Sequence, residues 1–408
     1  MTKKEISTYL KNTPSRYDKR AYDSFLKEHG LPNLPPAIHI TGTNGKGSSA
    51  RYIALSLEKS GYKVGLFTSP YFGCVNELAT INGKKITNDF ISEYIKKYDE
   101  SFEKHSLSLF EIMTFISLHY FAANKVDYMV IEVGMGGLFD ATNIFTPILS
   151  IITNIGLDHL EELGPTVEDI AEHKAGIIKE EVPLLLGEAP RRAEKLILDM
   201  AHRLNAPVYR VDNESIIITQ SLTKIKFTCK KEKYTLGSGA KYEVNNAVTA
   251  LNALEILIKQ GIKIDKLAIK ESLKIKPFSG RFTVMQKEPA IVVDGAHNPH
   301  AITALINDVK TYDKNIKVIF AAFSDKDYIQ EIDLLILGGA DVTLTTFDHP
   351  RATKDFGKTK LSFNNNHQSA IKEEINNLTS DDMLLIVGSL YFARLIIEEF
   401  KEGIYDKD

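Results

Sequence analysis

Cysteine is scarce in this 408-residue sequence, which contains only Cys74 and Cys229. Two cysteines exclude a disulfide framework and a four-thiolate zinc site within one chain. An excess of one charge is also absent, because 50 Lys and Arg residues stand against 53 Asp and Glu residues, a formal net charge of −3. This balance argues against a chain-wide nucleic-acid or membrane-surface binder.

Long apolar runs are missing as well. The tract 384–397 is interrupted by Ser389 and Arg394, and no window approaches the ~18 apolar residues of a membrane span. Residues 1–5 lead into no apolar stretch that resembles a signal peptide. Hydrophobic residues make up 43% of the chain, enough for sizeable cores. We therefore expect a cytoplasmic protein with neither a membrane nor a nucleic acid as partner.

Short β-rich segments alternate with segments of helical period, a pattern typical of parallel α/β proteins. We predict strands at 37–40, 64–68, 128–133 and 148–153, and in a second series at 290–294, 318–323, 342–344 and 384–387. We predict helices at 47–60, 88–104, 109–124, 301–310 and 367–378. The segment 208–236 is polar and alternating, which indicates a small antiparallel patch.

Proline and glycine residues separate the two series of strands. We predict a domain over residues 1–276, a linker at 277–280, and a second domain over 281–408. Dividing the length by a typical domain of ~150 residues also gives two to three domains.

The most informative stretch is Thr-Gly-Thr-Asn-Gly-Lys-Gly-Ser at 41–48, between a predicted strand and a predicted helix. Glycine lets backbone N–H groups converge on phosphate oxygens. The helix N-terminus and Lys46 add positive charge, and Ser48 could reach Mg²⁺ or a phosphate. The strict G-x-x-x-x-G-K-[ST] pattern is not met, since residue 40 is Ile. The stretch nevertheless predicts an ATP-binding loop.

This loop resembles the ATP loop of the Mur ligase superfamily, and the motifs around it resemble the folylpolyglutamate synthase/dihydrofolate synthase branch. The further motifs are Thr-Ser-Pro at 68–70, Glu-Val-Gly-Met-Gly-Gly at 132–137, Asp-Ala-Thr-Asn at 140–143, Thr-Asn-Ile-Gly-Leu-Asp-His at 153–159, His-Lys-Ala-Gly-Ile at 173–177, Asp-Gly-Ala-His-Asn-Pro at 294–299 and Gly-Ser-Leu at 388–390. The resemblance implies an N-terminal P-loop domain with a parallel sheet and a small antiparallel patch, followed by a Rossmann-like α/β domain.

Members of this family join an amino acid to a carboxylate at the expense of ATP. Phosphorylation makes the unreactive carboxylate a mixed anhydride that a neutral amine can attack. The resemblance implies addition of L-glutamate to dihydropteroate, to folylpolyglutamates or to both, and we favour the bifunctional case. Alternatives are a folylpolyglutamate synthase only, another Mur-type ligase and, from a different class, a nucleotide-dependent regulatory switch. We expect a monomer.

The resemblance also assigns site residues. Contacts with ATP are implied for Thr43, Asn44, Gly45, Lys46, Gly47, Ser48, Asn246, Arg281 and Asp294. Catalytic roles are implied for Lys46, Lys174 and His297, and two Mg²⁺ sites for Ser69, Glu132 and His159. Substrate contacts are implied for Phe110 and Asp140 at the folate end and for Ser389, which a helix N-cap would explain equally well.

Lys174 carries the most unusual expectation. In the resembled family the lysine of this motif bears a carbamate, formed when CO₂ adds to the neutral amine. The carbamate replaces a positive charge with a carboxylate-like group, which suits a position beside Mg²⁺. Such a lysine needs its charged form to be disfavoured by burial or by nearby cations.

Overall fold

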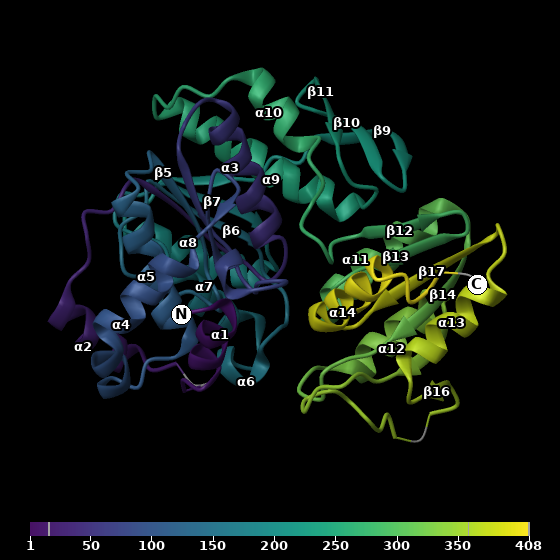
Figure 1. Ribbon diagram of the computed structural model, residues 1–408. Helices are drawn as coiled ribbons and strands as arrows, with labels where there is room; N and C mark the ends of the chain where they lie inside the picture. Colours follow the sequence, from purple (N-terminus) through teal and green to yellow (C-terminus); the bar gives the residue numbers. More distant parts are fainter. Residues whose placement is uncertain (15–16, 358, 407–408) are drawn as a thin grey trace. The chain divides into compact units, whose positions relative to one another are not determined.

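The structure, a computed structural model, describes residues 1–14, 17–357 and 359–406 (Figure 1). Two compact units are present. Unit 1 consists of Met1–Asn213 and Asn246–Leu273, and unit 2 consists of Glu214–Asn245 and Lys274–Asp408. Helix α9 (Lys241–Lys259) begins in unit 2 and ends in unit 1. The domain boundary at 277–280 stays a prediction, and unit 2 also takes in the segment that forms the antiparallel sheet.

Unit 1 is built on an eight-stranded sheet with the order β4-β3-β2-β5-β1-β6-β7-β8. Its strands are β1 (Ala37–Thr41), β2 (Val64–Phe67), β3 (Ala79–Ile81), β4 (Lys84–Lys85), β5 (Tyr128–Glu132), β6 (Leu149–Asn154), β7 (Leu184–Glu188) and β8 (Val208–Arg210). The strands from β2 to β8 in this order are parallel, while β3 and β4 pair antiparallel at one edge. The predicted strands of the first series are confirmed.

The central strand β1 is buried along its whole length. Strands covered on both faces read as continuous apolar runs, which is why sequence pattern identified them. On one face pack α4 (Asn88–Lys104) and α5 (Leu109–Ala123), and on the other lie α3 (Lys46–Lys59) and α10 (Lys266–Leu273) (Figure 1). The remaining helical segments of unit 1 are α1 (Lys3–Lys11), α2 (Lys19–His29), the 3₁₀ turn η1 (Val75–Leu78), α6 (Leu160–Leu163), α7 (Val167–Ala175) and α8 (Arg191–Arg203).

The order in which successive strands join the sheet reverses between β1 and β6, although the two strands are parallel. From β1 the chain crosses through α3 to β2 on one side of the sheet, whereas from β6 it proceeds to β7 on the other side. In open α/β sheets, ligands bind outside the carboxyl ends of strands at such a switch point. The segment 42–48 and residues after Asn154 both leave the sheet there.

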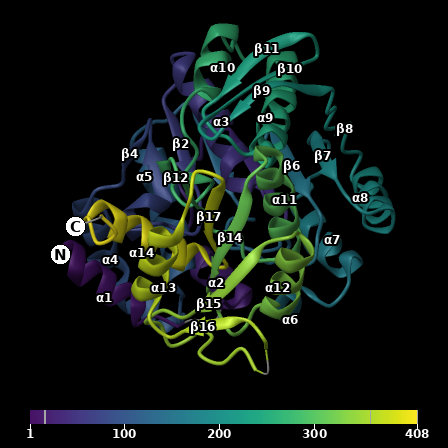
Figure 2. The same ribbon diagram turned by 90° about the vertical axis from the view of Figure 1, so that its right-hand side faces the viewer.

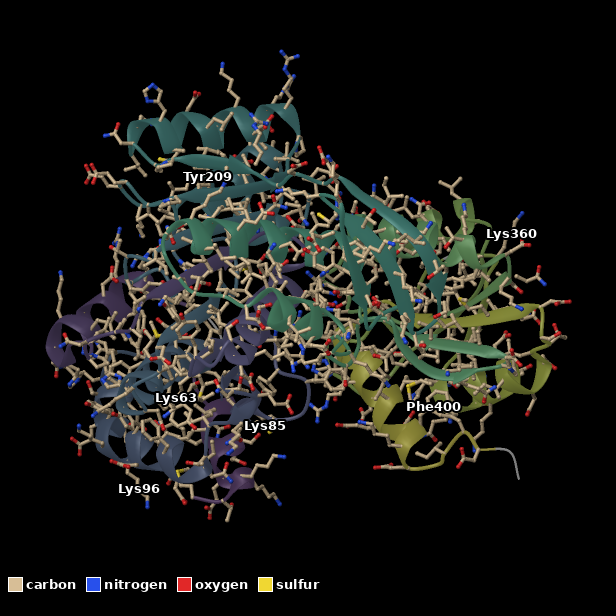
Figure 3. All side chains as sticks on the ribbon, turned by 90° about the horizontal axis from the view of Figure 1, so that it is seen from above. Lys63, Lys85, Lys96, Tyr209, Lys360 and Phe400 are labelled. Atoms are coloured by element: carbon tan, nitrogen blue, oxygen red, sulfur yellow. The ribbon has the colours of Figure 1, made fainter. Side chains whose placement is uncertain are left out.

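The antiparallel patch is shorter than the segment 208–236. Strands β9 (Ser215–Ser221), β10 (Lys224–Cys229) and β11 (Glu232–Leu236) form a three-stranded antiparallel sheet. The prediction is wrong for residues 208–210, because β8 pairs in parallel with β7 at the edge of the large sheet. Tyr209, labelled in Figure 3, lies on this edge strand.

The second sheet of unit 2 has the order β12-β13-β17-β14-β15-β16 and is parallel except for β12. Its strands are β12 (Thr283–Lys287), β13 (Ala290–Val293), β14 (Asn315–Phe320), β15 (Asp341–Thr345), β16 (Ser362–Asn364) and β17 (Asp382–Val387). The predicted strand 318–323 is wrong at both ends, because β14 begins at Asn315 and ends at Phe320.

Helices cover both faces of this sheet (Figure 2). On one face lie α11 (Pro299–Val309) and α12 (Tyr328–Leu337), and on the other lie α13 (His367–Asn377) and α14 (Leu390–Lys401), with the short 3₁₀ turn η2 (Lys310–Tyr312) after α11. Together with unit 1, this arrangement confirms the α/β prediction. Among the residues that the structure describes, no helix has the length and apolar character needed to cross a membrane.

Candidate active site

The glycine-rich loop begins at the carboxyl end of β1 and ends on the first turn of α3. Gly45 is the N-cap of α3 and has a left-handed backbone with φ of 81°. A Cβ atom at this position would lie 2.2 Å from Asn246 Oδ1, so that any other residue would displace the Asn246 side chain. Since the first N–H groups of a helix point beyond its N-terminus, the loop offers backbone donors that an anion could accept. The predicted contacts Gly47 and Ser48 lie on this first turn.

The last two residues of β6 hold the loop in place. Asn154 Oδ1 accepts a hydrogen bond from Asn44 N at 2.9 Å, and Asn154 Nδ2 donates to Asn44 O at 3.0 Å. Thr153 Oγ1 donates to the same carbonyl at 2.7 Å. Thr43 Oγ1 bonds with both Gly156 O and Gly156 N at 2.9 Å. The peptide of Asn44 is therefore fixed from both sides.

Thr153 and Asn154 were not among the predicted site residues. They belong to a motif that was recognised, but only its last residue, His159, was given a role. Because β1 and β6 are adjacent and parallel, their carboxyl ends meet at one edge. The position of these two polar residues at the end of a buried apolar strand was the signal that could have identified them.

Two lysine side chains converge on one backbone oxygen of the loop. Lys46 Nζ donates to Gly42 O at 2.9 Å and to Thr43 O at 3.1 Å. Lys174 Nζ, from the C-terminal turn of α7, donates to Gly42 O at 2.9 Å as well. Lys174 is only 4% exposed. Burial, and next the positive charge of Lys46, lower the pKa of Lys174 to about 7. Lys174 is therefore unlike an ordinary surface lysine of a helix.

Glu132 is the last residue of β5 and is 3% exposed, so that it does not face solvent. Its Oε2 accepts a hydrogen bond from Ser69 N at 2.9 Å. A Cβ atom on Gly47 would lie 3.2 Å from the same oxygen. The structure thus brings the predicted metal ligands Glu132 and Ser69 together beside the phosphate loop.

The side-chain atoms of Glu132 and Ser69 that could bind a metal ion are oxygens. In the described part of the chain, no group of three or more His, Cys, Asp or Glu side chains could hold a metal ion. A metal bound at Glu132 and Ser69 would therefore need phosphate oxygens and water to complete its coordination. Mg²⁺ accepts such a set, because it prefers oxygen ligands and keeps several waters.

His159, the third predicted ligand, lies on a more exposed loop. Its side chain is 39% exposed, and its backbone is left-handed with φ of 52°. Nε2 lies 3.9 Å from Asp158 Oδ2, and Nδ1 lies 3.8 Å from Glu162 Oε2. Two carboxylates thus surround the imidazole, and its role as a metal ligand stays a prediction.

The two predicted folate-end residues lie around the loop that follows β5. A Cβ atom on Gly134 would lie 2.5 Å from Phe110 Cζ, so that the Phe110 ring covers this loop. Asp140 is buried, and burial raises the pKa of its carboxyl group. Its oxygens accept hydrogen bonds from Met135 N at 2.9 Å and from Thr142 N and Oγ1 at 2.9 and 2.6 Å. Asp140 therefore organises the turn, and a role in binding substrate stays a prediction.

Unit 2 contains a second group of predicted residues, around Asp294. This residue follows β13 and is 2% exposed. Oδ2 accepts hydrogen bonds from Tyr242 Oη at 2.6 Å and Phe282 N at 2.7 Å, and Oδ1 accepts one from Ala296 N at 2.8 Å. Burial, and next the charge of Asp294, raise the pKa of Tyr242 well above its ordinary value. Asp294 thus fixes the first turn of α9 to the turn that contains Arg281.

The other predicted residues of unit 2 lie near the same edge of the sheet. His297 Nδ1 lies 2.7 Å from Gly295 O, and the following Asn298 caps α11. Ser389 is the N-cap of α14, where its hydroxyl accepts a hydrogen bond from Tyr391 N at 3.2 Å. The N-cap role of Ser389 is thus present, and its contact with substrate stays a prediction.

Comparison with known proteins identifies the family of the chain. Residues 40–254 match the Mur ligase middle domain, and residues 280–390 match the Mur ligase, glutamate ligase domain. The dihydrofolate synthase/folylpolyglutamate synthase of Bacillus subtilis is 33% identical over 389 residues, which cover 90% of each chain. The folylpolyglutamate synthase of Lacticaseibacillus casei is 31% identical over 391 residues, again 90% of each chain.

A solved structure agrees over nearly the whole length. An FPGS–AMPPCP–folate complex superimposes with a TM-score of 0.84 at 29% sequence identity, covering 97% of this chain and 98% of that one. The resemblance inferred from motifs and the predicted two-part α/β fold are both confirmed. The chain belongs to the folylpolyglutamate synthase/dihydrofolate synthase family of the Mur ligase superfamily.

Proposed function

We propose that the protein is an ATP-dependent ligase that joins the amino group of L-glutamate to a carboxyl group of dihydropteroate, of folylpolyglutamates, or of both. The observation that carries this proposal is the convergence of a phosphate loop, the buried carboxylate of Glu132 and the buried Lys174 at one edge of the sheet. Relatives that match 90% of the chain are named for these activities.

The first step is transfer of the γ-phosphoryl group of ATP to the acceptor carboxylate, which gives an acyl phosphate and ADP. Backbone donors of the loop and Lys46 stabilise the charge on the transferring phosphoryl group. The neutral amine of glutamate then attacks the acyl carbon. An amide forms, inorganic phosphate leaves, and a proton is released. Holding amine and acyl phosphate together contributes the entropic part of the rate enhancement.

Bound Mg²⁺ would neutralise phosphate charge and orient the triphosphate. Glu132 and Ser69 would hold a first ion and His159 a second. We further propose that Lys174 is carbamylated. Its neutral amine adds to CO₂, a C–N bond forms, and a proton passes to solvent. Burial and the nearby Lys46 favour the neutral amine that this reaction needs.

The nucleotide would also meet residues outside the loop. Asn246 lies against Gly45 and is proposed to contact ATP. In unit 2, Arg281 and Asp294 are proposed to bind the nucleotide, and His297 to act near the phosphate and glutamate. Phe110 and Asp140 are proposed to receive the pteridine end of the acceptor. We also propose that the protein is monomeric and cytoplasmic and that it has no nucleic-acid partner.

Two measurements test the function. Purified protein would be given dihydropteroate or tetrahydrofolate, each with glutamate, ATP and Mg²⁺, and phosphate release and product mass would be followed. Product from both acceptors supports the bifunctional case.

When the acceptor carboxyl group carries ¹⁸O, one labelled oxygen should appear in the released phosphate. Product formation without that transfer would refute the acyl phosphate. A regulatory switch would instead hydrolyse nucleotide slowly, whether or not a folate is present.

A further inference from the structure

A chain of hydrogen bonds runs from the core of unit 1 to the Asp140 carboxylate. His39 lies in the middle of β1 and is 0% exposed. Its Nε2 is 2.9 Å from Thr142 Oγ1. Thr142 Oγ1 in turn donates to Asp140 Oδ1 at 2.6 Å. All three residues are buried, so that water does not compete for these bonds.

The direction of each bond follows from the donors and acceptors available. A hydroxyl group has one proton, and that of Thr142 goes to the carboxylate. Thr142 Oγ1 must then accept from His39, so that the imidazole carries its proton on Nε2. Among the described residues, Nδ1 has no hydrogen-bond partner. Burial, with a smaller effect from Lys179, lowers the pKa of His39 to about 3, which keeps the ring neutral.

The ring itself is held firmly. Its centroid lies 5.0 Å from that of Phe145, and its strand is paired on both sides, with β5 and with β6. A carboxylate accepts about four hydrogen bonds. Donors within the loop occupy three of these positions on Asp140. One of these three donors, Thr142 Oγ1, is itself fixed by His39. The relay from His39 through Thr142 to Asp140 therefore helps to hold the carboxylate in one orientation.

We propose that His39 is a positioning residue for the acceptor end of the site, because through Thr142 it orients the Asp140 carboxylate and the loop that the Phe110 ring covers. This inference rests on the proposed function, in which Phe110 and Asp140 receive the N–H donors and the ring of a pteridine. His39 and Thr142 themselves touch neither acceptor nor nucleotide in this proposal. Their effect is therefore on acceptor affinity.

The test compares Michaelis constants for the two substrates. We expect His39→Ala and Thr142→Val each to raise KM for the folate acceptor about tenfold, on the scale of one buried hydrogen bond to a charged group. KM for ATP should change less than about twofold. Thr142→Ser keeps the hydroxyl and should restore KM for the acceptor. Because His39 and Thr142 act through the same chain of hydrogen bonds, KM for the acceptor in the double variant should be no higher than in the more affected single variant.

His119→Ala is the matched control. This residue is a partly buried histidine on α5, the helix that carries Phe110, and its Nδ1 bonds only with Phe115 O in the described network. It should leave KM for the acceptor unchanged. If His39→Ala does not fold, Thr142→Val and Thr142→Ser decide the question alone. Equal rises in both Michaelis constants, additive effects, or an unchanged acceptor KM in Thr142→Val would overturn the inference.

The outcome separates the relay from the function on which it rests. If wild-type protein ligates no folate acceptor, the proposed function fails. If wild-type protein is active and Asp140→Asn raises KM for the acceptor while the His39 and Thr142 variants do not, only the relay is wrong. If Asp140→Asn leaves that KM unchanged in an active enzyme, the relay is likewise refuted. Asp140 then does not bind the acceptor, and orienting its carboxylate cannot affect acceptor affinity.

Discussion

Two lysine ammonium groups share the carbonyl oxygen of Gly42, an arrangement that like charges would ordinarily avoid. Removing the charge from one of them relieves the repulsion. Lys46 lies on the half-buried loop, whereas Lys174 is enclosed, so that desolvation falls mainly on Lys174. Lys174 is therefore the more easily neutralised of the two, and Lys46 keeps its positive charge more readily.

We predict that Lys46→Met lowers kcat for ligation by about 100-fold or more, the scale expected when a donor to a developing anion is lost. The matched control is Lys59→Met, at the exposed last turn of the same helix α3, which should be close to wild type. Steady-state phosphate release measures both. Retained turnover in Lys46→Met would remove this side chain from phosphoryl transfer.

A second residue-scale prediction concerns pH. The pKa of Lys174 is lowered from 10.5 to about 7, so that the neutral amine grows from a minor to the major form as pH rises through 7. Carbamylation should follow the same curve. With ¹³C-bicarbonate, we expect a carbamate NMR signal that increases between about pH 6 and 8 and is absent in Lys174→Met. A signal that persists in Lys174→Met would assign the adduct to another amine.

At the scale of elements, the loop depends on how α3 begins and on what stands beside it. Gly45 combines a left-handed backbone with close approach of Asn246, the first residue of the part of α9 that belongs to unit 1. Asn154, at the end of β6, fixes the neighbouring peptide. Three elements far apart in sequence thus shape one phosphate-binding turn.

We predict that Gly45→Ala and Gly61→Ala each lose about 1–2 kcal/mol of folding free energy, because both backbones are left-handed, with φ of 81° and 97°. Only Gly45→Ala should also lose nucleotide affinity. Its new Cβ would meet Asn246, whereas nothing lies within 4 Å of a Cβ on Gly61. Urea unfolding and calorimetric titration with an ATP analogue measure the two effects. Equal nucleotide affinity in both variants would contradict this account.

In unit 2, Glu399 connects helix α14 to neighbouring residues through hydrogen bonds. This buried carboxylate accepts hydrogen bonds from His367 at 3.0 Å, Gln368 at 2.7 Å, and Tyr405. Burial raises its pKa, but the hydrogen bonds outweigh this effect and the pKa is lowered. The carboxylate therefore stabilises the fold above the ordinary Glu pKa of 4.5, and the contribution is lost as pH falls through the lowered value.

We predict that Glu399→Gln destabilises unit 2 by about 1–3 kcal/mol at pH 7, with a smaller loss in acid. The control is Glu398→Gln, which removes only a partly exposed pair with Arg394 at 3.1 Å and should cost less than about 0.5 kcal/mol. Urea unfolding at pH 7 and at a pH well below the lowered pKa of Glu399 gives both differences. An equal loss at the two pH values would show that the charge of Glu399 is unimportant.

At the scale of the whole molecule, both units use the same device. In each, polar residues at the ends of buried parallel strands gather at one edge of a sheet. Glu132 and Asn154 are the last residues of their strands in unit 1, and Asp294 follows its strand in unit 2. Such an edge combines a rigid support with helix N-termini suited to anions. The proposed ligase reaction would use two such edges, because the enzyme must bind a nucleotide together with two carboxylate substrates.

Binding at these edges should stabilise the folded molecule. An ATP analogue with Mg²⁺ at 100 times its Kd should add about 2.7 kcal/mol, since it binds only the native state. Differential scanning calorimetry should therefore show a higher Tm for wild-type protein. Lys46→Met should show a much smaller rise at the same concentration. An equal rise in that variant would place the nucleotide elsewhere.

The sequence by itself determined the parallel strands, the phosphate loop and the family, because continuous apolar runs and contiguous glycine-rich motifs are local signals. It left the assignment of β8 wrong and gave no role to Asn154, His39 or Thr142. Strand pairing and hydrogen bonds between residues more than a hundred positions apart depend on how elements pack. Only the tertiary structure placed Lys174 and Lys46 on one carbonyl oxygen, because burial and charge at a site are properties of the folded neighbourhood and not of any segment of chain.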